Sequence, residues 1–432
     1  MRNLLTRKRQ GLSALLSVLL LSACAPGQGG GEPEEPAAGS GAGDLPDEIV
    51  IGATLPLTGE ESRTGGFYKE GYELAFELEN EDGGLQVGDQ TVPLRLELLD
   101  DTSNQATAVG LAERLVTQDD VDALLGTYST SLVEAQSTAA EQNQIPYVNG
   151  GGAATSIYER GYRWIFGNLA AIELLAETEM EWIEEQQEAG NLPKPAKIAV
   201  VWENTSHGKD FQKGITEFVE ASGGDYEIVM DESFELNARD FSAPLSEVEA
   251  SGADLFMVDA HLPDYITMHR QYTTAGMCHD VITYGARGPE ADAREALGEE
   301  AVAYILSAVW WNAQLGDEGI NKEFVDAFKA KYEDREPEWY HSVSYEAARA
   351  LFTAIRDAGS VEPEAVRDAL ASLEMESLLP GGTLTFPEEN GFQAQYPFVV
   401  QQNLPDGTSP IIYPEDLARG EGVAPNPNCD QS

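Results

Sequence analysis

The feature that most constrains this chain is a regular alternation of short β-branched runs with longer stretches of helical periodicity. One series of alternating strand and helix patterns runs from residue 49 to 148, and a second runs from 169 to 284. Strands that alternate with helices form βαβ units, and these units build parallel sheets. The expected strands are 49–53, 92–98, 121–125, 145–148, 198–202, 226–230, 255–258 and 281–284. The sequence therefore predicts an α/β protein with two parallel sheets.

Helical spacing of apolar residues marks the segments between and after these strands. The expected helices are 67–79, 106–117, 132–142, 169–187, 209–221, 242–251, 263–275, 321–332, 345–358 and 363–373. Open parallel sheets bind ligands at the carboxyl ends of their strands. Two such sheets side by side therefore predict a ligand-binding cleft between them.

The chain has 432 residues, and its 75 Asp and Glu far outnumber its 26 Lys and Arg. At about 150 residues per domain this length predicts two or three domains. The excess of negative charge argues against nucleic acid or an anionic membrane surface as a partner, because both would be repelled. Only 9 of the basic residues are Lys. This balance is typical of a salt-tolerant surface, and we treat halophily as a hypothesis.

The first residues have the pattern of an export signal. Four basic residues precede an apolar stretch at 12–21, and the sequence Leu21-Ser22-Ala23-Cys24 resembles a bacterial lipobox, whose Cys carries the lipid. The apolar stretch is too short to span a bilayer permanently. Residues 25–47 are rich in Gly, Pro and Glu, as flexible linkers are. We expect an extracytoplasmic lipoprotein that a lipid at Cys24 alone attaches to the membrane.

Two further cysteines, Cys278 and Cys429, remain after Cys24 is assigned to lipid. In an oxidising compartment they either form a disulfide or stay as free thiols. The sequence leaves both alternatives open.

Catalytic and metal-binding patterns are missing from the sequence. The five histidines form no HExxH or other tight ligand spacing, and there is no P-loop and no nucleophile elbow. We therefore expect no enzyme activity, no cofactor and no metal.

Small and hydroxyl-bearing residues follow two of the expected strands. Gly126 to Ser131 follows strand 121–125, and its hydroxyls and backbone N–H groups could hold a carboxylate or simply cap the next helix. Asn149 to Thr155 follows strand 145–148, where small residues either let a ligand approach the backbone or form a plain turn.

These segments, in this order, resemble the solute receptors of ABC importers for branched-chain amino acids and amides, which have the type I periplasmic-binding fold. The resemblance covers about residues 48 to 418. It rests on short motifs that are each weak alone: Ile51 to Gly59, Asp100-Asp101, Gly126 to Ser131, Ile145 to Val148, Trp202 to Gly208, Phe241-Ser242, Gly381 to Phe386 and Gly391.

The resemblance implies two Rossmann-like lobes joined by a three-segment hinge and closing on ligand. We expect the crossings near Gly167, Ala308 and Asn390. The resulting division is 1–23 as signal peptide, 24–47 as tether, 48–167 with 308–390 as lobe 1, 168–307 with 391–418 as lobe 2, and 419–432 as a C-terminal tail.

The resemblance also implies a set of ligand-binding positions. The hydroxyl loop and the small-residue loop match the family's contacts to a ligand carboxylate and amino group, and His207 and His261 stand where the family usually has aromatic residues. The implied positions are Ser129, Thr130, Ser131, Gly152, Ala153, Ala154, Thr155, His207, Asp259, His261 and Arg287. The two histidines are either structural or make uptake depend on pH.

Arg287 occupies the position at which the branched-chain receptors carry the acid that pairs with the ligand's ammonium group. An Arg repels an ammonium and clamps a carboxylate, which favours an organic acid, an acidic amino acid or an amide as the ligand. Two alternatives stay open: Arg287 lies on the rim of the cleft, or Asp259 supplies the missing acid.

The sequence thus predicts a monomeric extracytoplasmic receptor that captures a small polar solute and delivers it to ABC permease subunits. A sensory subunit of the same fold, which presents ligand to a membrane kinase or chemoreceptor, is the alternative.

If the acidic surface is adapted to salt, the melting temperature should rise between low and molar salt, because salt screens repulsion among exposed carboxylates. Thermal denaturation at increasing salt concentration measures this effect. A flat curve would contradict the halophily hypothesis.

Overall fold

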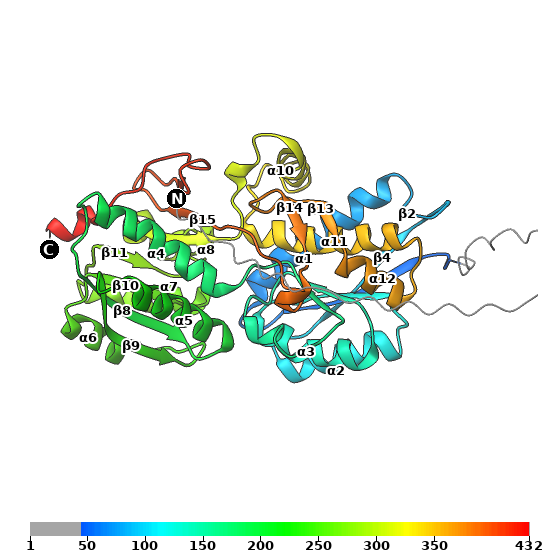
Figure 1. Ribbon diagram of the computed structural model, residues 1–432, viewed down its shortest axis with the longest axis horizontal. Helices are drawn as coiled ribbons and strands as arrows, with labels where there is room; N and C mark the ends of the chain where they lie inside the picture. Colours follow the sequence, from blue (N-terminus) through cyan, green and yellow to red (C-terminus); the bar gives the residue numbers. More distant parts are fainter. Residues whose placement is uncertain (1–44, 432) are drawn as a thin grey trace, which may run out of the picture. The chain divides into compact units, whose positions relative to one another are not determined.

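Two mostly parallel sheets organise the computed structural model, which describes residues 45–431 (Figure 1). All of these residues belong to one unit of the chain. The expected signal peptide, the lipobox with Cys24 and nearly all of the expected tether lie outside the described residues. Within residues 45–431, no helix combines the length and the apolar character needed to cross a membrane.

The first sheet has the order β4-β1-β5-β6-β7, and every neighbouring pair is parallel. Its strands are β1 (Ile49–Leu55), β4 (Leu94–Asp100), β5 (Ala123–Leu125), β6 (Tyr147–Asn149) and β7 (Ile165–Gly167). A small hairpin of β2 (Leu85–Val87) and β3 (Gln90–Val92) precedes β4, so the expected strand at 92–98 is divided between the hairpin and β4.

Helices cover both faces of the first sheet. On one face, α2 (Gln105–Thr117) and α3 (Thr130–Asn143) contribute Leu115, Val133 and Ala140 to a core with the sheet. On the other face, α1 (Ser62–Glu81) packs against α11 (Trp339–Ala358), as Figure 1 shows. Helices α10 (Gly319–Lys331) and α12 (Pro363–Ala371) and the hairpin of β13 (Glu374–Glu376) and β14 (Thr383–Thr385) complete this group. We call it the first lobe.

The second sheet has the order β16-β15-β12-β11-β10-β8-β9. Its five strands from β12 to β9 are parallel, whereas β15 and β16 are antiparallel additions at one edge. The strands are β8 (Ala196–Glu203), β9 (Tyr226–Phe234), β10 (Leu255–Asp259), β11 (Val281–Thr283), β12 (Ile305–Val309), β15 (Val399–Gln402) and β16 (Ile411–Tyr413). The sequence had not predicted β12, β15 or β16, which come after the last regular βα repeat.

Helices also cover both faces of the second sheet. The face with α4 (Ile172–Glu188) and α5 (Ser206–Ala221) belongs to the same hydrophobic core as the α1 and α11 face of the first lobe. The opposite face packs on α6 (Ser242–Ser251), α7 (Leu262–Thr274) and α8 (Ala291–Leu297). The short helix α9 (Glu299–Val302) follows α8. We call this group the second lobe.

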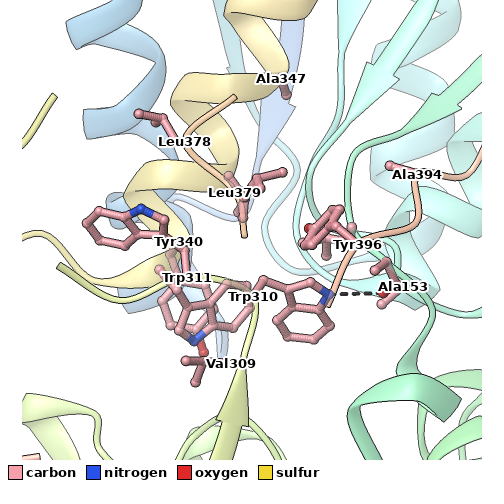
Figure 2. Close-up of a cluster of buried hydrophobic side chains, with 14 of the residues drawn as sticks. Ala153, Val309, Trp310, Trp311, Tyr340, Ala347, Leu378, Leu379, Ala394 and Tyr396 are labelled. Atoms are coloured by element: carbon pink, nitrogen blue, oxygen red, sulfur yellow. Dashed lines mark hydrogen bonds between the residues drawn. The ribbon is translucent and has the colours of Figure 1, made fainter. Parts of the chain in front are cut away.

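Three chain segments join the lobes, and aromatic side chains hold them together (Figure 2). Trp310 directly follows β12, and its indole N–H donates to the carbonyl of Ala170 at 2.9 Å. Tyr396 lies in the segment that precedes β15, and its hydroxyl donates to the carbonyl of Asn168, in the segment that follows β7, at 2.7 Å. Since β12 runs to Val309, the chain leaves the second sheet slightly after the expected crossing near Ala308.

The fold arranges the polar loops at facing ends of the two sheets. Each parallel strand of a βαβ unit ends at the same edge of its sheet. In the first lobe the loops after β5 and β6 lie at this edge, and in the second lobe the loops after β8, β10 and β11 do. Hydrogen bonds between loops of different lobes, such as Arg287 to Tyr128 at 3.2 Å, show that the two edges meet.

The structure joins Cys278 and Cys429 in a disulfide, with their Cα atoms 5.3 Å apart and a sequence separation of 151. The bond attaches the C-terminal segment to the second lobe beside His279, whose carbonyl lies 3.3 Å from the sulfur of Cys429.

A protein with this disulfide should show no reactive thiol beyond that of Cys24 when it is titrated in denaturant without reductant. Replacing Cys429 by Ser should lower the free energy of unfolding by up to about 4–5 kcal/mol, because the unfolded chain loses the constraint of a long closed loop. Denaturant titration of the variant measures this loss. Two additional reactive thiols in the wild type would contradict the pairing.

Candidate functional site

A small enclosed cavity lies between the carboxyl ends of the two sheets. Its walls come from both lobes and from the segments that join them. The lining residues are Tyr128, Ser129, Thr130, Gly151, Ala153, Leu169, His207, His261, Arg287, Trp310 and Trp339. The volume of this cavity is about 10 Å³, which is enough for about one water molecule. The lobes are thus closed around this space.

Local backbone geometry brings the loops close together. Gly285 has φ of +54°, which favours glycine, and a Cβ at this position would lie 2.7 Å from Oδ1 of Asp259. The glycine therefore allows the loop after β11 to approach Asp259 and to place Arg287 beside it. In the first lobe, a Cβ on Gly151 would lie 2.0 Å from the carbonyl oxygen of Thr127, so the loops after β5 and β6 are in direct backbone contact.

Asp259, the last residue of β10, is fully buried and holds two basic side chains. Nδ1 of His207 lies 2.8 Å from Oδ2 of Asp259, and Nη1 of Arg287 lies 3.7 Å from Oδ1. Burial opposes ionisation of Asp259, but the charge and hydrogen bond of His207, followed by the charge of Arg287, outweigh burial and lower its pKa. Asp259 is therefore a carboxylate that orients both bases.

His261 connects the two lobes. Its Nδ1 lies 2.7 Å from Glu61 of the first lobe, and its Nε2 lies 3.4 Å from Glu203 of the second. Burial would lower the pKa of His261, but the charge of Glu203, then Tyr128 and Glu61, raise it well above the ordinary value. Burial likewise opposes ionisation of Glu61, and the charge and hydrogen bond of His261 reverse this effect and lower the pKa. The contact is a buried ion pair across the cleft.

Arg287 is only 2% exposed and has unused hydrogen-bonding capacity. Its Nη2 donates to the phenol oxygen of Tyr128 at 3.2 Å, whereas Nε and Nη1 have no hydrogen-bond partner within residues 45–431. Trp339 also lines the cavity, and its indole N–H has no partner in this part of the chain either. A buried donor without an acceptor costs about 1–3 kcal/mol, and more when it is charged. These unpaired donors indicate a place for an acceptor group.

The structure brings together some of the residues predicted from the sequence and not others. Ser129, Thr130, Ala153, His207, His261 and Arg287 line the cavity. Asp259 lies behind His207 and Arg287 and does not line it. The cavity lining also omits Ser131, Gly152, Ala154 and Thr155.

The residues outside the cavity have identifiable positions. Ser131 faces two open hollows between the lobes, of about 620 and 460 Å³. Thr155 contacts the second lobe directly: its N–H donates to Asp210 at 2.8 Å and its hydroxyl donates to Glu173. Gly152 and Ala154 are buried in the loop after β6. Of the cavity residues, Ser129 also borders the smaller hollow.

Several residues of the site were missed in the sequence. Tyr128, Trp310 and Trp339 contribute aromatic walls, and Glu61 and Glu203 hold His261. Glu203 had a usable signal, because it directly follows the expected strand 198–202. Trp339 had none, since it belongs to the first turn of α11, six residues before the expected start of that helix.

Glu203, His207 and Asp259 are close enough to be considered as metal ligands, since their ligand atoms lie within 4.8 Å of one another. The guanidinium of Arg287 already lies 3.7 Å from Asp259, and the imidazole of His261 lies 3.4 Å from Glu203. A divalent cation would face both positive groups at short range. We therefore assign the two acids to ion pairs with these bases.

A fold of two α/β lobes with a closed, charged cavity between their strand ends defines a solute-binding protein of the periplasmic type. Residues 48–408 match the periplasmic binding protein family, and the chain belongs to this family.

Individual relatives agree with this assignment. The Leu/Ile/Val-binding protein homolog 8 of Brucella abortus (strain 2308) is 27% identical over 381 residues, covering 86% of this chain and 92% of the relative. The branched-chain amino acid transporter substrate binding protein LivJ of Streptococcus pneumoniae, solved with isoleucine, is 19% identical with a TM-score of 0.73, covering 88% of this chain and 100% of LivJ. An ABC transporter solute binding protein of R. palustris, solved with benzoate, is 20% identical with a TM-score of 0.71, covering 87% and 98%.

The contact between the lobes contains a second group of acids, around Glu290 and Glu338. Tyr340 of the first lobe donates to Glu290 of the second at 2.6 Å, and Arg63 of the first lobe pairs with Asp292 of the second at 2.5 Å. Burial, followed by the charge of Glu338, raises the pKa of Glu290 to about 8. Burial, followed by the charge of Asp292, raises the pKa of Glu338 to about 7. The contact between the lobes therefore favours the protonated forms of Glu290 and Glu338.

The free energy of unfolding should fall as the pH rises from about 4.5 toward 8, because the folded protein holds protons on Glu290 and Glu338 that the unfolded chain has released. Replacing Glu290 by Gln keeps an acceptor for Tyr340 and removes the titration. The variant should lose less stability over this range and exceed the wild type by about 1–3 kcal/mol at pH 8.

Denaturant unfolding between pH 4.5 and 9 measures this difference. Glu295 provides the matched control, because it is exposed on α8, the helix that begins directly after Glu290. The variant Glu295→Gln should follow the wild type. Parallel curves for Glu290→Gln and the wild type would contradict the assignment of the proton to Glu290.

Proposed function

We propose that this chain is the extracytoplasmic solute-binding receptor of an ABC importer, and that it captures an amino acid, an amide or a small organic acid between its lobes. The observation that carries the proposal is the closed cavity beside Arg287. This residue is only 2% exposed, and it has N–H donors without a hydrogen-bond partner in the described part of the chain. Asp259, 3.7 Å from Nη1, balances the charge of Arg287, but a buried N–H group without an acceptor is costly until an anionic or polar group meets it.

Contacts across the cleft support an opening and closing movement. Arg287 reaches Tyr128, and His261 reaches Glu61, so both bonds join one lobe to the other. Opening of the lobes breaks these bonds and exposes the cavity, and a bound solute that bridges the lobes favours closure. We propose the segments 168–171, 310–313 and 391–398 as the hinge.

The known ligands of two neighbours bear on the class of solute. LivJ was solved with isoleucine and the R. palustris protein with benzoate. Both ligands carry a carboxylate, and only isoleucine carries an ammonium group. By analogy we propose a carboxylate or an amide as the group that this receptor holds.

The proposed location and partners follow from the same assignment. A receptor of this class works outside the cytoplasmic membrane and docks on permease subunits. We further propose that a lipid on Cys24 attaches it to the membrane and that residues 24–47 serve as a tether.

Mass spectrometry of small molecules released from the purified protein, followed by a thermal-shift panel of amino acids, amides and organic acids, tests the proposal. A ligand at 100 times its Kd should stabilise the folded state by about 2.7 kcal/mol. Glucose and a polyamine, which have no carboxylate or amide, are the negative controls. If no member of the panel changes the melting temperature, the proposed function fails.

A further inference from the structure

We propose that the cavity selects an apolar monocarboxylate that lacks an α-ammonium group, and that Arg287 holds its carboxylate. This inference rests on the proposed function and specifies the chemical class of its solute.

The donors of the cavity wall match one carboxylate. Nε of Arg287 has no hydrogen-bond partner within residues 45–431. Nε and Nη2 form one edge of the guanidinium, a fixed fork that fits the two oxygens of a carboxylate when Nη2 leaves the phenol oxygen of Tyr128. Trp339, whose indole N–H has no hydrogen-bond partner within residues 45–431, also lines the cavity. The hydroxyls of Ser129 and Thr130 belong to the facing lobe.

An ammonium group would find no acid at this wall. Among the described residues, 45–431, those that line the cavity include no Asp and no Glu. The nearest acids face bases of the protein: Asp259 lies beside His207 and Arg287, and Glu203 lies beside His261 and accepts from the hydroxyl of Thr205 at 2.7 Å. One oxygen of each acid has no hydrogen-bond partner within residues 45–431, but neither acid lines the cavity. A ligand ammonium at this wall would therefore meet the guanidinium of Arg287 without a lining carboxylate beside it.

One part of the wall is apolar. Leu169, Trp310, Trp339 and Ala153 are at least 94% buried and surround the space beside Arg287. A second carboxylate placed against these four side chains would be buried among apolar groups without a partner, which is strongly unfavourable. One carboxylate on an apolar body fits this combination of walls.

The phenol oxygen of Tyr128 occupies the position on Arg287 that we propose for the ligand carboxylate. Its phenol oxygen accepts from Nη2 of Arg287, and its ring lies against Tyr68, Tyr340 and His261. The remaining space holds about one water molecule. Binding therefore requires the ligand carboxylate to replace the phenol oxygen of Tyr128 on Arg287 as the lobes separate and close again.

Two matched pairs of ligands test the selection by isothermal titration of the full-length protein at pH 7. The first pair is 3-phenylpropanoate and L-phenylalanine, and the second is 4-methylpentanoate and L-leucine. The two members of each pair differ only in the ammonium group. We expect the acid without the amino group to bind at least tenfold more tightly in both pairs. Tighter binding of the amino acids would overturn the inference and leave the proposed function standing. If neither member of either pair binds, the inference fails. The proposed function is then tested separately by the thermal-shift panel of amino acids, amides and organic acids.

Variants of Arg287 and Tyr128 test the geometry. Arg287→Gln should weaken binding of the acid by about 100-fold, and Arg287→Lys, which keeps the charge without the fork, should weaken it less. Arg270, exposed in the same lobe, is the control, and Arg270→Gln should bind like the wild type.

Tyr128→Phe keeps the ring and removes the competing oxygen, so it should bind the acid several-fold more tightly than the wild type. This variant keeps the test decisive even if the Arg287 variants do not fold. Unchanged or weaker binding by Tyr128→Phe would overturn the placement of the carboxylate on Arg287.

Discussion

The buried ion network around Asp259 is the interaction on which the site depends. Asp259 holds His207 at 2.8 Å and Arg287 at 3.7 Å, and His261, two residues further on, joins Glu203 to Glu61 of the opposite lobe. Charges so deeply buried are stable only when they are paired. Pairing fixes the orientation of Arg287 and also links the two lobes, so the side chains that line the cavity also hold the lobes together.

The junction of the lobes has a different character from the cleft. Trp310 and Tyr396 pack among the buried apolar side chains of Figure 2 and bond to backbone carbonyls of the segment that follows β7. The cleft is closed by ionic and polar contacts, which water can replace, whereas the junction is closed by apolar packing, which water cannot. This contrast favours separation of the lobes at the cleft with little change at the junction.

Sequence periodicity predicted the regular part of the fold well and its edges poorly. The eight expected strands correspond to β1, β4, β5, β6 and β8 to β11, because βα repeats give a strong local signal. Strands β7, β12, β15 and β16 were not predicted, since β7, β15 and β16 have only three or four residues each and β12 is not directly followed by a regular α-helix. Helix α11 begins at Trp339 because Glu338 and His341 form a capping box, which apolar spacing alone did not show.

The sequence by itself determined the α/β class, the two series of repeats, and the loops that carry Ser129, Ala153, His207, His261 and Arg287. These features depend on local patterns and on resemblance in short motifs. Only the tertiary structure decided that Arg287 meets Tyr128, 159 residues away, that His261 meets Glu61, 200 residues away, and that Ser131 and Thr155 lie outside the cavity. The physical reason is that such meetings depend on how three separate chain crossings align the two sheets, which no local pattern in the sequence encodes.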